Sequence, residues 1–160
     1  MVIDLGCGGN KRGDVGIDMV QMPGVDKICH LGFEPIPLED GVADRVLAYD
    51  LLEHIPGTMY HKCLQGWIPI HPRIQLLREI YRILRPGGKF ESFTPSWTSP
   101  NWCKDPTHDG PPWCKESWEY FCGKVPDWMA LAYGIDFKFK MCSVEYVPEY
   151  GGHLKVIVEK

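Results

Sequence analysis

Val2-Ile3-Asp4-Leu5-Gly6-Cys7-Gly8-Gly9-Asn10-Lys11 is the most informative stretch of this 160-residue chain. Its first four residues have the pattern of a short strand that enters a buried sheet. Three glycines in the next four positions allow a sharp turn and a close approach of the backbone to a ligand. The stretch therefore predicts a ligand-binding loop at the end of a strand.

A second short apolar run, Val15-Gly16-Ile17-Asp18, also ends on a carboxylate. An acid at the end of the second strand is well placed to hold a ribose with two free hydroxyls. Lys11 stands where a dinucleotide-binding loop has its third glycine, and Asp18 follows Gly6 too closely for a full helix between the two strands. A pyrophosphate needs the N-terminus of that helix, whereas S-adenosylmethionine carries no phosphate. The loop thus favours S-adenosylmethionine over NAD.

Four motifs resemble, in order and spacing, those of a class I S-adenosylmethionine-dependent methyltransferase with a methyltransferase type 11-like domain. They are Asp4-Leu5-Gly6-Cys7-Gly8, Asp18, Leu52-Glu53-His54 and Leu84-Arg85-Pro86-Gly87-Gly88. The resemblance implies an α/β fold, a Rossmann-like three-layer sandwich with a mostly parallel sheet of the seven-strand type and an antiparallel last hairpin. We expect the helices that precede the first strand in this family to be absent, and the first crossover helix to be short or missing.

The resemblance also implies which residues hold S-adenosylmethionine. The first loop would bind the methionine end, Asp18 the ribose, the residues after the second and third strands the adenine, and the end of the fourth strand the sulfonium. The expected cofactor-binding residues are Asp4, Gly6, Cys7, Gly8, Asn10, Asp18, Met19, His30, Leu31, Tyr49, Asp50 and Leu51. Many relatives have an acid at the position of His30, where an imidazole could instead hydrogen-bond or stack on adenine. Met19 could equally be an ordinary boundary residue.

Three side chains are candidates for removing a proton from the methyl acceptor: His54, Asp105 and His108. A histidine is suited to this role at neutral pH. The alternatives are that His54 braces its turn and that residues 105–108 form an Asx-type turn. A base is optional, because positioning of donor and acceptor can supply most of the catalysis.

Residues 95–128, here named the flap, hold five of the six tryptophans, six prolines and three cysteines. We expect one domain over residues 1–160, with the flap ordered, carrying a short helix at 115–121 and contributing to acceptor choice. Its tryptophans Trp97, Trp102, Trp113 and Trp118 could line an acceptor cavity or form the core of the flap.

Periodicity predicts the remaining elements. Helices are expected at 73–84 and 126–133, a short helix with a loop within 57–71, and strands at 25–31, 43–50, 89–94, 137–146 and 153–159. Arg78, Arg82 and Arg85 share one side of the first of these helices, which is more typical of a solvated surface than of a nucleic-acid site.

Charge, apolar runs and cysteine spacing indicate which membrane, metal and protein partners the sequence favours. The net charge is −4, and no apolar run reaches the roughly 18 residues of a membrane span. Seven cysteines at irregular spacing predict free thiols in the cytoplasm. Cys103, His108, Cys114 and Cys122 lack the close spacing of structural zinc sites, so no metal is expected. A homodimer is compatible with the sequence.

The resulting hypothesis is methyl transfer from S-adenosylmethionine, by in-line displacement, to a small molecule or to a group on a larger substrate. The sequence does not identify the acceptor atom. The alternative is a methyltransferase-like protein that binds the cofactor without turnover and acts as a partner or regulatory subunit.

Overall fold

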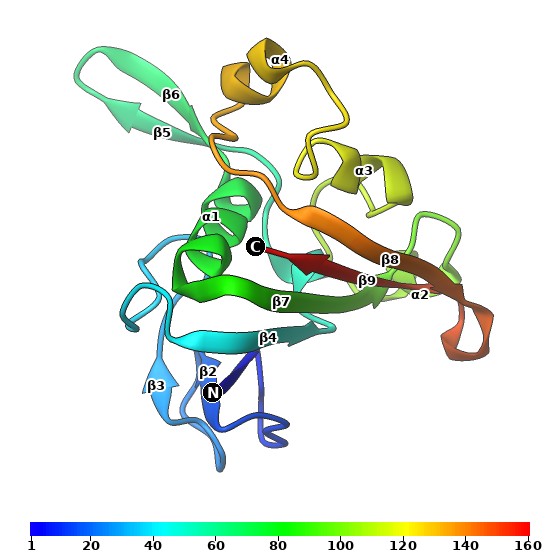
Figure 1. Cartoon of the computed structure of the whole chain (residues 1–160). Coiled ribbons are helices and arrows are strands. Elements are labelled where there is room, and N and C mark those ends of the chain that lie inside the picture. Colours follow the sequence, from blue (N-terminus) through cyan, green and yellow to red (C-terminus); the bar gives the residue numbers. More distant parts are fainter.

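The computed structural model describes the backbone of residues 1–160 and every side chain except that of Tyr150. Figure 1 shows the elements in chain order. They are β1 (Val2–Leu5), β2 (Val15–Asp18), β3 (Lys27–Ile28), β4 (Ala43–Tyr49), η1 (Leu52–His54), β5 (Met59–Cys63), β6 (Gly66–Ile70), α1 (Pro72–Ile83), β7 (Leu84–Pro95), α2 (Pro100–Lys104), α3 (Lys115–Glu119), α4 (Asp127–Ala132), β8 (Lys140–Val147), η2 (Pro148–Tyr150) and β9 (His153–Glu159).

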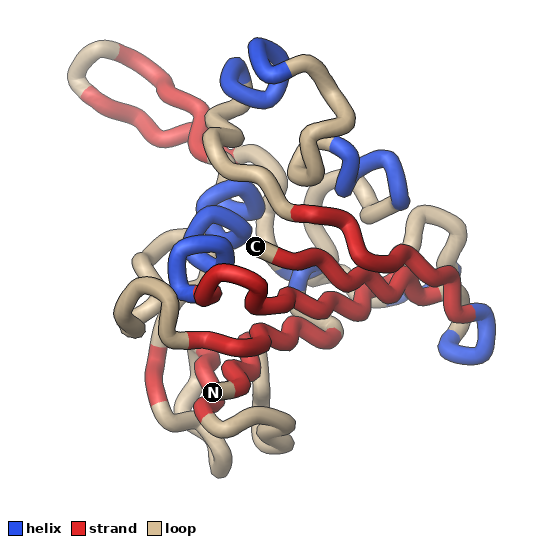
Figure 2. Tube along the Cα trace, viewed as in Figure 1, coloured by secondary structure: helices blue, strands red, loops and turns tan.

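Seven strands form one twisted sheet in the order β3-β2-β1-β4-β7-β9-β8. The first five of these are parallel, and β9 runs antiparallel to both β7 and β8. The sheet crosses the middle of the molecule in Figure 2. The predicted α/β fold, with its antiparallel last hairpin and no helix between β1 and β2, is confirmed. Because parallel strands end at the same edge, the loops after β1, β2 and β4 lie together.

The helix α1 forms where the apolar spacing predicts it. Leu76, Leu77, Ile80 and Ile83 are buried on one side, and Pro72 begins the helix. Its C-terminal residue is followed at once by β7, which begins at Leu84 and not at residue 89 as predicted. The reason is that Leu84 already pairs with Ala43 before the ladder shifts register.

The flap and the segment after it cover the same face of the sheet as α1. Phe90 of β7 packs against Trp118 of α3, with ring centroids 6.0 Å apart. Tyr81 of α1 lies 5.5 Å from Phe137 and 5.2 Å from Phe139. The two predicted flap and post-flap helices are present but shorter, as α3 and α4, and α2 was not predicted.

Two predictions of local structure are wrong. Residues 57–71 were expected to hold a short helix and a loop, but β5 and β6 form an antiparallel hairpin with Met59 opposite Ile70. The hairpin extends away from the sheet in Figure 1, and its isolation lets the strand tolerate Pro69. The expected strand at 25–31 is only two residues long, because the chain turns where Phe33 and Glu34 donate backbone hydrogen bonds to the carbonyl of His30.

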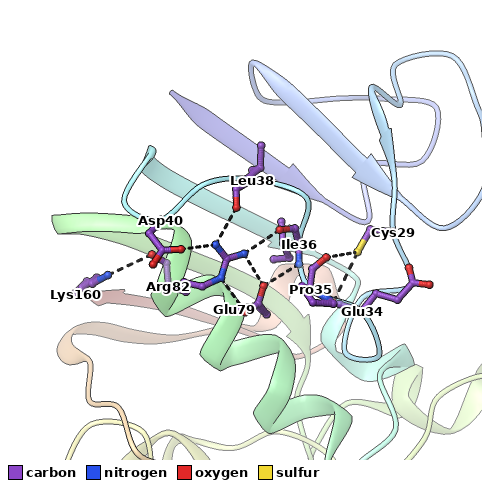
Figure 3. A network of polar contacts seen from close by, with 9 residues as sticks. All are labelled: Cys29, Glu34, Pro35, Ile36, Leu38, Asp40, Glu79, Arg82 and Lys160. Carbon is purple, nitrogen blue, oxygen red and sulfur yellow. Dashed lines mark hydrogen bonds and ion pairs between the residues drawn. The ribbon is translucent and has the colours of Figure 1, made fainter.

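Arg82 of α1 holds the loop before β4. Its guanidinium donates to the carboxylates of Glu79 and Asp40 and to the carbonyls of Ile36 and Leu38, at 2.6–2.9 Å. Figure 3 shows Arg82 at the centre of this network. This part of the predicted basic face therefore has a structural role. Among the described residues, no helix has the length and apolar character needed to cross a membrane.

Candidate active site

The loop after β1 needs glycine at two positions. Gly6 and Gly8 have φ values of 65° and 52°, which side chains disfavour. A Cβ on Gly6 would lie 2.9 Å from Cδ1 of Leu51, whereas a Cβ on Gly8 would meet nothing within 4 Å. The Gly8 amide donates to Oδ2 of Asp18 at 2.9 Å, which fixes the loop to the end of β2. The loop therefore packs against Leu51 at Gly6 and leaves open space next to its backbone at Gly8.

A pocket opens beside this loop, at the carboxyl ends of β1, β2 and β4. Seven predicted cofactor-binding residues line it together with His54, while Cys29, Phe33 and Ile55 complete the wall. The predicted residues are Gly6, Asp18, Met19, His30, Leu31, Asp50 and Leu51. Phe33 is 48% exposed, so its ring is available for stacking. The pocket combines the carboxylates of Asp18 and Asp50 with apolar and aromatic side chains.

Asp50 lines both this pocket and a second, more polar one, which Arg12, Tyr49, Glu91 and Lys155 also line. It is the one residue other than glycine with a positive φ, 51°, among those described, and its amide donates to the carbonyl of Phe93 at 2.8 Å. Its Oδ1 lies 3.1 Å from Nε2 of His153, whose ring stacks on Phe93 with centroids 4.5 Å apart. Strained backbone of this kind is typical of functional sites.

The three predicted proton acceptors come together next to the first pocket. The rings of His54 and His108 lie 4.8 Å apart. Thr107 Oγ1 donates to Oδ1 of Asp105 at 2.6 Å and lies 2.9 Å from Nδ1 of His54. Because the hydroxyl has a single proton, it must accept from Nδ1–H of His54. Hydrogen bonds from Thr107 lower the pKa of Asp105.

Glu53 lies behind the two histidines. Its side chain is 1% exposed, and its Oε2 accepts from Thr94 Oγ1 at 2.7 Å. Burial raises the pKa of this carboxyl. Glu53, His54 and His108 each offer one potential metal-ligand atom, and these three atoms lie within 4.8 Å of one another. Cys103, His108, Cys114 and Cys122 form no comparable group among the described side chains.

Residues 17–91 match the sequence profile of a methyltransferase domain. A search of curated proteins found no match. An S-adenosylmethionine-dependent methyltransferase from Archaeoglobus fulgidus has a similar structure, with a TM-score of 0.64 at 15% identity over 99% of this chain and 85% of that one. The chain therefore carries a methyltransferase-domain profile over part of its length and shares the fold of this solved methyltransferase.

Two further solved structures show what this fold can accommodate. The Burkholderia thailandensis 1,6-didemethyltoxoflavin-N1-methyltransferase, with 1,6-didemethyltoxoflavin and S-adenosylhomocysteine bound, matches with a TM-score of 0.55 at 15% identity, over 99% of this chain and 70% of that one. SpnF, a [4+2]-cyclase, matches with a TM-score of 0.63 at 14% identity, over 99% and 73%. The fold alone therefore does not specify the reaction.

The remaining predicted cofactor-binding residues lie around the pocket and do not line it. Cys7 is buried, which raises the pKa of its thiol, and Asn10 is exposed. Tyr49 points to the other face of β4, where its hydroxyl donates to Glu91 at 2.5 Å and burial raises its pKa to about 12. Gly8 shapes the loop.

The surroundings of Asp4 show whether the site fits S-adenosylmethionine. Oδ2 of Asp4 accepts from the amide of Arg12 at 2.6 Å, and burial raises the pKa of the carboxyl. Its Oδ1 is buried and has no hydrogen-bond partner in the described part of the chain. A buried carboxylate oxygen without a partner is the kind of group that the ammonium of S-adenosylmethionine would satisfy. The residues present therefore fit this cofactor.

Two of the four named tryptophans of the flap form its core, and the other two are not fully buried. Trp113 and Trp118 are buried, with centroids 5.3 Å apart, and belong to the core. Trp102 lies 5.3 Å from the ring of His108, and Trp97 is 67% exposed.

Sequence reasoning missed several residues of the site. Glu53 belongs to a quoted motif but was not given a role, and Phe33 follows the third strand without any periodic pattern. Arg12 lines the second pocket, and His153 reaches Asp50 only because β9 pairs with β7. Contacts between residues so far apart in sequence leave no local pattern.

Proposed function

We propose that this methyltransferase transfers the methyl group of S-adenosylmethionine to a hydroxyl or amine of a small molecule, or of a group presented by a larger substrate. The observation that carries the proposal is the position of His54. It lines the first pocket and also lies 4.8 Å from the ring of His108. An acceptor next to His54 would therefore be close to a methyl donor held in that pocket.

Different residues in and around the first pocket would bind different parts of the cofactor. Asp18 would bind the ribose, and Met19, His30, Leu31 and Phe33 would surround the adenine. Asp4 and the loop with Gly6, Cys7, Gly8 and Asn10 would hold the methionine end, while the backbone at Tyr49 and the side chains of Asp50 and Leu51 would border the sulfonium. When bound, S-adenosylmethionine supplies a methyl carbon already activated by a positive sulfur, so that alignment of the acceptor provides most of the catalysis.

His54, Asp105 and His108 would form the acceptor end of the site. The Nδ1 atoms of the histidines contact Thr107 and the carbonyl of Trp102. Their Nε2 atoms are then left for the acceptor side. Asp105 would act as a positioning residue, because it reaches His54 only through Thr107.

A small-molecule acceptor is supported by the Burkholderia enzyme, which has the same fold and binds 1,6-didemethyltoxoflavin together with S-adenosylhomocysteine. The partly buried Trp102, next to His108, offers a flat apolar surface for such an acceptor. We further propose a reducing compartment such as the cytoplasm, because all seven cysteines are free thiols. The predicted homodimer stays a prediction.

Binding of S-adenosylhomocysteine, measured by calorimetry, tests the cofactor half of the proposal. We expect the wild type to bind and Asp18→Ala to lose at least about tenfold in affinity, since a charge-assisted hydrogen bond to the ribose is removed. Asp127→Ala is the matched control, because Asp127 is exposed and pairs only with Lys138. Absence of binding to the folded wild type would refute the proposal.

Turnover tests the acceptor half. Hydroxyl and amine acceptors are incubated with S-adenosylmethionine, and the mass of the product is measured. We expect a gain of one methyl group that depends on Asp18. Tight cofactor binding without product over a broad acceptor panel would instead favour the catalytically inactive partner subunit.

A further inference from the structure

We propose that Glu53, His54 and His108 bind a divalent transition-metal ion at the acceptor end of the site. Each residue offers one ligand atom, and the three atoms lie within 4.8 Å of one another. Glu53 and His54 are neighbours on η1, and the flap brings His108 against them. The group therefore depends on the tertiary fold and joins two segments of the chain that are more than 50 residues apart.

Hydrogen bonds orient both imidazoles for metal binding. His108 Nδ1 lies 3.0 Å from the carbonyl of Trp102, which can only accept a hydrogen bond, so this nitrogen carries the proton. His54 Nδ1 carries its proton for the same reason, since the hydroxyl proton of Thr107 is donated to Asp105. Both Nε2 atoms then have a free lone pair. Metal-binding histidines in proteins are typically held in this way through their second nitrogen.

The environment of Glu53 favours a cation. The carboxylate is buried, and Thr94, its hydrogen-bond donor, is neutral. No described side chain forms an ion pair with it. The nearby guanidinium of Arg73 donates to the carbonyls of Ile55, Asp109 and Pro111. Burying an unpaired carboxylate is costly, and an ion between Glu53 and the imidazoles would offset that cost.

The ligand types indicate the class of metal. Two imidazole nitrogens and one carboxylate oxygen suit Fe²⁺, Mn²⁺, Co²⁺ or Zn²⁺ better than Ca²⁺ or Mg²⁺, which prefer oxygen ligands. Glu53 closes the inner side, whereas His54 is exposed and His108 is half-buried. Three protein ligands with an open outer side leave coordination positions for a further ligand, as in catalytic metal sites.

The role of the ion rests on the proposed methyl transfer and specifies its acceptor. An acceptor hydroxyl coordinated at the open side would have a lowered pKa and would release its proton to solvent. Its oxygen would then form a bond to the methyl carbon while the carbon–sulfur bond breaks and sulfur leaves as a neutral thioether. The substrate class is therefore an alcohol or phenol, favoured when a second adjacent oxygen can also bind the ion. His54 and His108 would be ligands, not proton acceptors.

Titration of chelator-treated protein with Co²⁺, followed by visible absorption, tests the site without any turnover. We expect one Co²⁺ per chain, and a loss of affinity of about 100-fold or more in His108→Ala and in Glu53→Gln, because each removes a ligand atom. His61→Ala is the matched control, since His61 is exposed on β5, in the hairpin that extends away from the sheet. Its affinity should equal that of the wild type.

Two further measurements make the result decisive. Circular dichroism melting shows whether each variant is folded, and His108→Ala, which changes a half-buried flap residue, provides the test if Glu53→Gln unfolds. Co²⁺ binding that survives in His108→Ala, a thiolate charge-transfer band, or no binding by the wild type would overturn the proposal. Calorimetry with S-adenosylhomocysteine on the metal-free wild type separates the metal site from the proposed methyl transfer. Binding of S-adenosylhomocysteine without binding of Co²⁺ refutes only the metal site. Binding of Co²⁺ without binding of S-adenosylhomocysteine refutes only methyl transfer.

Discussion

Glu91 of β7 is a buried carboxylate held by three neighbours. Tyr49 donates to it at 2.5 Å, and Arg45 and Lys155 lie 2.9 Å and 3.1 Å from its oxygens. Burial by itself would raise the pKa of Glu91, but these partners together lower it below its ordinary value. The ion pairs join β4, β7 and β9 on the face of the sheet opposite α1. Their contribution to stability therefore depends on pH.

Glu91 is expected to make the protein sensitive to acid. Because its pKa is lower in the folded state, it stabilises the fold above its unfolded pKa, and this stabilisation is lost as pH falls through the folded pKa. Urea unfolding from neutral pH down to about pH 3 should show a smaller loss of unfolding free energy in Glu91→Gln than in the wild type. Glu39→Gln, an exposed control, should follow the wild type. Parallel curves for all three proteins would contradict this account.

At the level of single residues, the sequence predicted which residue types gather at the site but not how they contact one another. Asp18 and Gly6 were predicted from loop chemistry, which demands an acid and a glycine at those positions, and both line the first pocket. His54, Asp105 and His108 were singled out by residue type, and the structure brings them together. The bridging role of Thr107 and the reach of His153 to Asp50 could not be predicted, because both depend on folding of distant segments.

Arg82 connects α1 to the loop before β4. Replacing it in Arg82→Met should lower the free energy of unfolding by about 1–3 kcal/mol, because the carbonyls of Ile36 and Leu38 and two carboxylates lose a charged donor. Urea denaturation measures the loss. Lys62→Met, an exposed change on β5, should cost less than about 0.5 kcal/mol. A similar small effect of Arg82→Met would show that the network is replaced by water.

At the level of elements, regular periodicity was a reliable guide and irregular segments were not. The helix α1 and the strands β4 and β9 lie within a residue of their predicted bounds, because their buried faces repeat clearly. The hairpin of β5 and β6 was missed, since its residues are almost all exposed and have no buried face to set a pattern. The strand β3 is shorter than predicted because hydrogen bonds of the following turn override strand propensity.

Arg73 couples the flap to the rest of the molecule. Arg73 lies in the first turn of α1. It donates to the carbonyl of Ile55 at 2.8 Å and to that of Pro111 at 2.6 Å. Burial lowers its pKa to about 10, so it remains charged at neutral pH. The position of His108 relative to η1 therefore depends on a residue that belongs neither to the first pocket nor to the group of Glu53, His54 and His108.

Arg73→Met should loosen the flap without disturbing the cofactor pocket. We expect a loss of about 2–3 kcal/mol in unfolding free energy, because three carbonyls lose a charged donor in a buried setting. Hydrogen exchange should become faster in residues 105–113, while S-adenosylhomocysteine affinity changes less than threefold. Arg78→Met, which alters a partly exposed arginine of the same helix that pairs with Asp136, is the control. Unchanged exchange in the flap would contradict the coupling.

The indole rings of Trp113 and Trp118 have an optical consequence. Their centroids are 5.3 Å apart with the planes inclined by 33°, inside the core that the flap shares with β7. Two chromophores this close in a fixed mutual orientation interact electronically, so their excitations split into a circular dichroism couplet. When tight packing loosens but the backbone stays folded, such side-chain signals vanish first. The circular dichroism couplet therefore reports whether the flap is ordered. It needs no label and can be recorded while cofactor, metal or acceptor is added.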